Sequence, residues 1–250
     1  MQRSVLITGS AGGIGAATVE LFHKQGWKTF ATDRRDIEPE IEGLDFKACD
    51  VSDPDEVDSL FTWLSERTDT LHALVNNAAV QISKPLVEMS VEEWDETLAS
   101  NLRSVFLTVK TGYEMLRQAQ SAAIVNVSSV HAIATSTGIA AYAASKGGLL
   151  ALTRAMAIEF AADRIRVNTI LPGAVDTEML RSGLGRGHIG GESVEERLRE
   201  LGGRTVMGRV GEPDEIAAAI YFLADEGQSS FMTGNSLVVD GGATARLSTE

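Results

Sequence analysis

Three residues in the middle of the chain have the types and spacing of an acid–base catalytic site: Ser129, Tyr142 and Lys146. On a helix, residues four apart share a face, so Tyr142 and Lys146 would place an ammonium beside a phenol. Two opposite charges about 4 Å apart attract by roughly 4 kcal/mol at an intermediate dielectric. Because one pKa unit is about 1.36 kcal/mol, the lysine could bring the tyrosine pKa from ~10 towards neutrality. The Ser129 hydroxyl could hold the substrate oxygen while the proton moves.

A Tyr-x-x-x-Lys pair alone also fits a solvated lysine beside a packed tyrosine, so the surrounding elements decide. A β-branched run over 4–8 is followed by a glycine loop and an amphipathic helix over 16–25. A strand, a glycine loop and a helix in this order can bring backbone N–H groups to the pyrophosphate of a dinucleotide. The alternative interpretation is an ordinary tight turn between a strand and a helix. A second strand over 28–32 ends in Asp33, where a carboxylate can accept hydrogen bonds from an adenosine ribose.

With these elements in place, the chain resembles the short-chain dehydrogenase/reductase family from end to end. The motifs that carry the resemblance are Thr8-Gly-Ser-Ala-Gly-Gly-Ile-Gly15, Cys49-Asp50-Val51, Asn76-Asn77-Ala78-Ala79, Asn101, the strand 124–129, Tyr142 with Lys146, the loop 172–177, Gly208-Arg209 with Glu212-Pro213, Thr233-Gly234 and the segment 239–242. Ser129 lies thirteen residues before Tyr142, which is the family spacing. Ala79 departs from the family's glycine, and alanine adopts positive φ less freely.

The resemblance implies the roles of individual residues. The catalytic set would be Asn101, Ser129, Tyr142 and Lys146, with Asn101 anchoring a water in the proton relay. The cofactor-binding set would be Gly9, Gly13, Ile14, Gly15, Asp33, Asp50, Val51, Asn77, Ala78, Tyr142, Lys146, Pro172, Val175 and Thr177. No metal is expected.

We expect an α/β fold over 1–250: a single-domain doubly wound Rossmann fold with a seven-stranded parallel sheet flanked by helices on both faces. Strand-like runs recur at 4–8, 28–32, 44–48, 71–75, 122–127, 165–171 and 236–239. Helical stretches separate most of them, which is typical of a parallel sheet. A length of 250 residues with 44% hydrophobic content suffices for one substantial core.

One segment, at about 180–203, breaks the regular pattern. It contains a charged helical piece over 194–201 among seven glycines: Gly183, Gly185, Gly187, Gly190, Gly191, Gly202 and Gly203. Such an insertion in a compact domain is more often a mobile lid than a structural element. The family resemblance implies that it closes over the substrate.

Charge and composition limit the partners. A net charge of −13 and a pI near 4.8 disfavour binding to nucleic acid or to an anionic membrane. With Cys49 as the single cysteine, no intrachain disulfide is expected. The first strand begins too close to Met1 to leave room for a signal peptide, and no apolar run reaches the ~20 residues that span a bilayer. We therefore expect a soluble cytoplasmic protein.

Two helices indicate self-association. The stretches 148–160 and 95–116 are apolar on more than one stripe, as expected of helices buried on more than one side. A core helix beneath its own sheet explains part of this pattern. The family resemblance favours a homotetramer over that alternative.

Cofactor choice rests on conflicting charges. The carboxylate of Asp33 would bind a ribose 2′-hydroxyl and repel a 2′-phosphate, whereas Arg34 and Arg35 could pair with that phosphate. Asp33 stands nearest the sugar, and the loop residues Ala11 and Gly12 carry no basic side chain. NAD is therefore expected rather than NADP.

The substrate is expected to be a small alcohol or ketone, for which Gln81 and His131 are candidate contacts. The strings around them resemble family members acting on 3-hydroxybutyrate, but Ile139 stands where those members have a carboxylate-binding lysine. An NADP-dependent 3-oxoacyl reductase is a second alternative, although an acidic carrier would favour a basic docking patch. A catalytically silent nucleotide-sensing module is a third, and it would be expected to lose one of the four catalytic residues.

Overall fold

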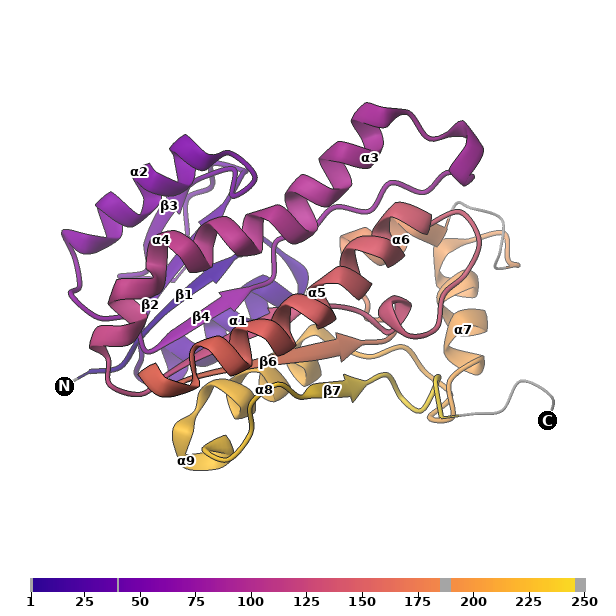
Figure 1. Ribbon diagram of the computed structural model, residues 1–250. Coiled ribbons are helices and arrows are strands. Elements are labelled where there is room, and N and C mark those ends of the chain that lie inside the picture. The colour runs from indigo at the N-terminus through magenta and orange to yellow at the C-terminus, as the bar shows by residue number, and fades with distance from the viewer. Residues whose placement is uncertain (1, 40, 185–189, 246–250) are drawn as a thin grey trace.

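The computed structural model describes residues 2–39, 41–184 and 190–245. Seven parallel strands form one sheet in the order β3-β2-β1-β4-β5-β6-β7 (Figure 1). The strands are β1 (Ser4–Thr8), β2 (Lys28–Asp33), β3 (Asp45–Ala48), β4 (Ala73–Asn76), β5 (Ala122–Val127), β6 (Ile165–Pro172) and β7 (Ser236–Val239). This order confirms the predicted α/β, doubly wound Rossmann fold.

Helices cover both faces of the sheet. The helices are α1 (Gly13–Lys24), α2 (Pro54–Ser65), α3 (Val91–Leu98), α4 (Ser104–Gln118), α5 (Ala140–Glu159), α6 (Glu178–Gly183), α7 (Val194–Gly203), α8 (Pro213–Ala224) and α9 (Glu226–Ser229). Short turns are η1 (Leu86–Glu88), η2 (Ala99–Arg103), η3 (Val130–Ala132) and η4 (Ala161–Asp163). Figure 1 shows α5 crossing in front of the sheet and α1 behind it, with α7 beyond the arrowhead end of β6.

The core has two halves because alternate residues of each strand point to opposite faces. On one face, Leu6, Leu74 and Ile124 pack against α2, α4 and α5. On the other face, Val5 and Val75 pack against α1 and α8. Within the described residues, no helix is both long and apolar enough to cross a membrane.

The stretch 95–116, which the sequence suggested as one apolar helix, is not one continuous α-helix. It spans the end of α3, the π turn η2 and most of α4. A π turn holds one more residue than the corresponding α turn and is frequent at functional sites. Here it contains Asn101, one of the predicted catalytic residues.

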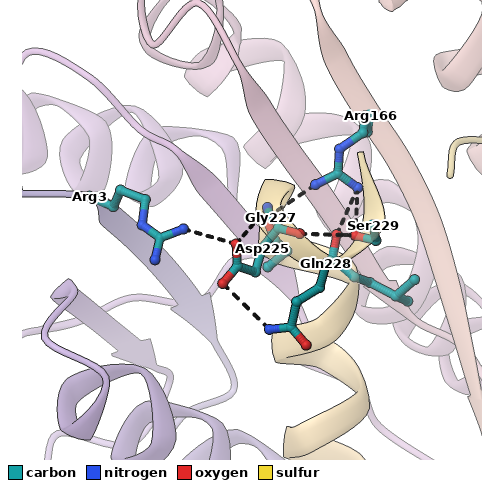
Figure 2. Close-up of polar contacts among 8 residues, drawn as sticks. Arg3, Arg166, Asp225, Gly227, Gln228 and Ser229 are labelled. Carbon is teal, nitrogen blue, oxygen red and sulfur yellow. Dashed lines mark hydrogen bonds and ion pairs between the residues drawn. The ribbon is translucent and has the colours of Figure 1, made fainter. Parts of the chain in front are cut away.

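An arginine on β6 ties the C-terminal part of the chain to the sheet (Figure 2). The Arg166 guanidinium donates to the carbonyls of Leu223 (2.9 Å) and Ala224 (3.2 Å), the last two residues of α8. Carbonyls at a helix C-terminus lack intrahelical donors, and a cation there also complements the helix dipole. Close by, Arg3 forms an ion pair of 3.1 Å with Asp225, which links the residue before β1 to the junction of α8 and α9.

Candidate active site

The predicted site residues gather at the carboxyl end of the sheet. Strand order reverses between β1 and β4, and open parallel sheets bind ligands at such a switch point. The glycine loop follows β1, Asp33 ends β2, Asn77 follows β4 and Ser129 follows β5. Segments far apart in the sequence therefore meet at one edge.

The glycine loop packs against the segment after β4 with no room for side chains. A Cβ at Gly9 would lie 2.7 Å from the Ala78 Cα, and one at Gly15 would lie 2.0 Å from the Gly9 oxygen. Gly9 also has φ +65°, which favours glycine. The Asn77 Nδ2 donates to the oxygens of Thr8 (3.1 Å) and Gly9 (2.9 Å), which locks the two segments together.

The start of α1 suits an anion. Gly12 is its N-cap, no side chain caps the helix, and its first turn holds no acidic residue. The first N–H groups of a helix have no intrahelical acceptor, so this glycine-lined N-terminus fits a dinucleotide pyrophosphate. Gly13 (φ +51°) and the half-buried Ile14 lie in this turn, and a Cβ at Gly13 would lie 3.0 Å from the Thr177 Cγ2.

Asp33 is buried at the end of β2, and its carboxylate already has partners within the protein. One oxygen accepts from the Ala11 N–H (3.0 Å), and the other accepts from the Arg35 N–H (3.0 Å) and Nε (3.3 Å). The Arg35 guanidinium also pairs with Glu178 on α6 at 3.6 Å. The Arg35 guanidinium therefore lies within ion-pair distance of two carboxylates, one of them on an exposed side chain.

The remaining predicted cofactor residues lie after β3 and at or after the end of β6. The Asp50 carboxylate accepts from the Ser52 N–H (2.9 Å) and hydroxyl (2.7 Å), and Val51 is buried. Pro172 ends β6, and Val175 forms an isolated bridge with Gly211. Thr177 is the N-cap of α6, where its hydroxyl accepts from the Leu180 N–H (3.2 Å).

Tyr142 and Lys146 lie on the same face of α5, as their four-residue spacing predicted, and both are buried. Tyr142 is 7% exposed and Lys146 is 2% exposed. The Lys146 Nζ donates to the Val127 carbonyl (2.8 Å) at the end of β5 and lies 5.6 Å from the centre of the Tyr142 ring. Ser129 follows two residues after Val127, and its hydroxyl is hydrogen-bonded to Tyr142.

The protonation expected from the sequence needs correction. Burial raises the pKa of Tyr142 to about 12, and the hydrogen bond with Ser129 offsets this in part. Burial also lowers the pKa of Lys146 to about 7. The cause is desolvation, which disfavours the charged form of both side chains. In this structure the lysine therefore does not bring the tyrosine pKa towards neutrality.

Asn101 uses its whole carboxamide inside the protein. Its Oδ1 accepts from the Val80 N–H (2.8 Å), and its Nδ2 donates to the Val80 oxygen (2.9 Å) and to the Ser145 hydroxyl (3.0 Å). The side chain is 1% exposed. It therefore joins the segment after β4 to α5.

The two candidate substrate residues have different surroundings. The His131 ring lies edge-on to the Tyr142 ring, 6.1 Å between centroids. The backbone N–H of His131 donates to the Ser129 hydroxyl (3.2 Å). Gln81 is half-buried and donates to the Ser83 hydroxyl (3.1 Å). Ile139 is fully buried at the start of α5.

Several residues in the site were not predicted from the sequence. The Thr8 hydroxyl accepts from the N–H groups of Asn77 and Ala78, both at 3.1 Å. Ser145 bonds Asn101, and the Ser128 hydroxyl donates to the Lys146 carbonyl (3.0 Å). Thr8, Ser128 and Ser145 lie inside the recognised motifs, so the sequence could have marked their hydroxyl groups as candidates. Their hydrogen-bond partners depend on how the elements pack and could not be predicted from the sequence. In the described ranges, no group of three or more His, Cys, Asp and Glu side chains could hold a metal ion.

The glycine-rich segment has its own small core. Leu184 and Leu198 are buried together, with α6 and α7 residues packed around them. A Cβ at Gly202 would lie 2.9 Å from the Arg209 Cα, and one at Gly191 would lie 3.0 Å from the Glu196 Cβ, so these two glycines permit close packing. Gly185 and Gly187 lie outside the described residues.

Comparisons with known proteins agree with this geometry. The family model described as enoyl-(acyl carrier protein) reductase matches residues 9–244. The chain is 35% identical to the cyclopentanol dehydrogenase of a Comamonas species over 253 residues, which cover 98% of each chain. It is 35% identical to the 3-oxoacyl-(acyl-carrier-protein) reductase of Thermotoga maritima over 247 residues, 95% of this chain and 96% of that one. The ligand-free aldohexose dehydrogenase of Thermoplasma acidophilum superposes with a TM-score of 0.92 at 31% identity, covering 99% of this chain and 96% of that one.

Proposed function

The chain belongs to the short-chain dehydrogenase/reductase family of oxidoreductases, and we propose that it transfers a hydride between NAD and a secondary alcohol or ketone. The observation that carries the proposal is the buried cluster of Ser129, Tyr142 and Lys146 beside a glycine loop suited to a dinucleotide. The nicotinamide would supply the hydride acceptor or donor. The side chains of this cluster would handle the proton.

Each side chain of the cluster has a role that fits its surroundings. Tyr142 would give a proton to the ketone oxygen, or take one from the alcohol, and Ser129 would hold that oxygen by a hydrogen bond. Lys146 would bind the nicotinamide ribose. Asn101 would hold the segment after β4 next to α5, and the second lone pair of its Oδ1 would anchor a water in the proton relay. His131, edge-on to Tyr142, and Gln81 would contact the substrate.

We propose NAD over NADP because Asp33 ends β2, where the adenosine ribose of a bound dinucleotide would lie. A 2′-phosphate next to this carboxylate would meet a like charge. The repulsion costs about 4 kcal/mol for two unit charges about 4 Å apart at an effective dielectric of ~20. The Arg35 guanidinium favours the opposite choice, but Asp33 and Glu178 already share its charge. An exposed arginine pair contributes about 1 kcal/mol or less, so Asp33 should dominate.

For the substrate class, we propose an uncharged secondary alcohol or ketone. A small acid such as 3-hydroxybutyrate needs a cation for its carboxylate, and the side chain at position 139 is a fully buried isoleucine. The similarity to a cyclopentanol dehydrogenase makes cyclic secondary alcohols the first choice. The similarity to a 3-oxoacyl reductase keeps an acyl-carrier substrate with NADP as the second candidate.

The test is a panel of substrates with both cofactors, read by the absorbance of the reduced nicotinamide. The panel holds cyclopentanol and other secondary alcohols, an aldohexose, 3-hydroxybutyrate, and a 3-oxoacyl thioester with reduced cofactor. We expect catalytic efficiency at least ~10-fold higher with NAD than with NADP, and Asp33→Ala should narrow or reverse this gap. Equal efficiency with both cofactors would contradict the NAD assignment. Binding of both cofactors without turnover of any substrate would favour a nucleotide-sensing module.

A further inference from the structure

Ser145 is a fully buried serine between Tyr142 and Lys146 that makes two hydrogen bonds. Its hydroxyl donates to the Tyr142 carbonyl (2.7 Å) one turn earlier in α5. The same oxygen accepts from the Asn101 Nδ2 (3.0 Å), which comes from the π turn η2. One hydroxyl therefore connects the turn that carries the tyrosine to a neighbouring element.

The connection continues beyond Asn101. Its carboxamide holds both the N–H and the oxygen of Val80, two residues after Ala78. The bonds thus run in series from the Tyr142 carbonyl through Ser145 and Asn101 to Val80. This series crosses three separate parts of the chain that border the site: α5, η2 and the segment after β4.

A second contact shows that α5 and η2 pack closely near Ser145 and Asn101. A Cβ at Gly148 would lie 3.0 Å from the Leu102 Cδ2, so the absence of a side chain at Gly148 lets the π turn approach α5. The extra residue of a π turn changes the direction of the side chains that follow it. In this geometry the Asn101 carboxamide faces Val80 on one side and Ser145 on the other.

We propose that Ser145 is a positioning residue, which sets the orientation of the Asn101 carboxamide and couples it to the Tyr142 turn. Without the hydroxyl, one Asn101 N–H would be buried with no acceptor from Ser145, and an unpaired buried donor is unfavourable. The carboxamide would then reorient and loosen its hold on Val80. The importance of this coupling for turnover rests on the proposed function, whereas its structural part does not.

The chain offers a matched control in the same helix. Thr153 is also a buried hydroxyl of α5, and it bonds Asn126 (2.9 Å) and Thr169 (2.7 Å). Thr153→Val removes a buried hydroxyl with two partners, as Ser145→Ala does, but touches neither Asn101 nor Val80. Ser145→Cys, which keeps a weak donor and acceptor of similar size, serves as the conservative variant.

The first measurement is residue-resolved hydrogen exchange of the Val80 amide in the full-length protein. We expect exchange at least ~10-fold faster in Ser145→Ala than in wild type, an intermediate rate in Ser145→Cys, and an unchanged rate in Thr153→Val. Val80 exchange in Ser145→Ala equal to that in Thr153→Val would overturn the proposal. Should Ser145→Ala fail to fold, Ser145→Cys decides by the same comparison.

The second measurement is the pH profile of turnover with the best substrate found. Ser145→Ala should lower kcat by roughly 10-fold with KM nearly unchanged, and it should move the apparent pKa of the profile, because a proton-transfer group would be displaced. Thr153→Val should lower thermal stability and leave the apparent pKa in place. An unshifted profile in Ser145→Ala would refute the coupling to Tyr142. If wild type turns over no substrate, the proposed function fails and Val80 exchange still decides the role of Ser145.

Discussion

At the scale of single residues, burial controls the proton chemistry of the site. Tyr142 has a pKa of about 12, so it is protonated at neutral pH and suited to donate a proton to a ketone oxygen. Lys146 has a pKa of about 7 and uses one N–H on the Val127 carbonyl. Lys146 is held by the end of β5, and Tyr142 is hydrogen-bonded to Ser129 rather than to Lys146.

Replacing the phenol should separate catalysis from binding. Tyr142→Phe should lower turnover at least ~10²-fold, the usual scale for a positioned proton-transfer group. Binding of NADH, followed by its fluorescence, should stay within about twofold of wild type, because the ring still fills its buried place. Retention of more than half of the wild-type turnover would show that another group moves the proton.

Lys146 predicts how stability depends on pH. Its pKa in the folded protein, about 7, lies below its ordinary value of 10.5. Between these pH values the unfolded chain binds a proton that the folded chain does not, so the stability contributed by this residue rises with pH. Lys146→Met removes the titration.

The free energy of unfolding, measured with urea at pH 7 and pH 10, tests this sign. The free energy of unfolding of Lys146→Met should exceed that of wild type by more at pH 7 than at pH 10. At pH 7 folding of wild type requires the unfavourable burial of a charged lysine or the release of its proton, whereas at pH 10 the unfolded lysine is already partly neutral. A difference between the two proteins that stays constant with pH would show that the lysine titrates normally.

At the scale of elements, α6 and α7 form a unit that is weakly attached to the sheet. Their small core contains Leu184 and Leu198, and their ion pairs with the rest of the protein are exposed, such as Arg35 with Glu178. Segments with few buried contacts open at low free energy. We propose that this unit is the lid of the substrate site.

Hydrogen exchange over 178–184 and 190–203 should report the lid. Exchange should be faster in the free protein than in the complex with cofactor and a substrate analogue, whereas β5 should be equally protected in both. Equal, strong protection of the two helices in both states would leave the segment as an ordinary part of the fold.

The elements of the fold were largely predictable from the sequence, whereas several contacts between them were not. Parallel strands buried on both faces are near-continuous apolar runs, which is why β1 and β5 occur at the predicted residues. The end of β2 and the segment after β5 then place Asp33 and Ser129 at the same edge of the sheet. The π turn at 99–103 gave no signal, because its residues also suit an α-helix. The bond from Lys146 to Val127 depends on how α5 packs against β5, which no local pattern encodes.

At the scale of the whole molecule, one face of α5 remains uncovered in the single chain. Small residues, Ala144, Ala151 and Ala155, are exposed along it, together with Ile158, which is 80% exposed. On α4, Phe106 is half exposed. Small side chains let two helices approach closely, so we propose that this face joins subunits of a homotetramer.

Charge placed on this face should disrupt the assembly. Ile158→Asp should reduce the mass measured by light scattering after size-exclusion chromatography, because association would bury an unpaired carboxylate. Ser59→Asp, at an exposed position of α2, should leave the mass unchanged. If wild type is a monomer, or if Ile158→Asp assembles as wild type does, this face is not the contact between subunits.

The Arg166 contacts have a consequence for the order in which the protein is made. The ribosome adds Arg166 57 residues before Leu223 and 66 residues before Met232, whose carbonyls accept its hydrogen bonds. A nascent chain that stops short of α8 would have β6 in its sheet with a half-buried cation and none of these acceptors. Because these acceptors lie on α8 and in the segment before β7, β6 can reach its final stability only after those residues have been translated.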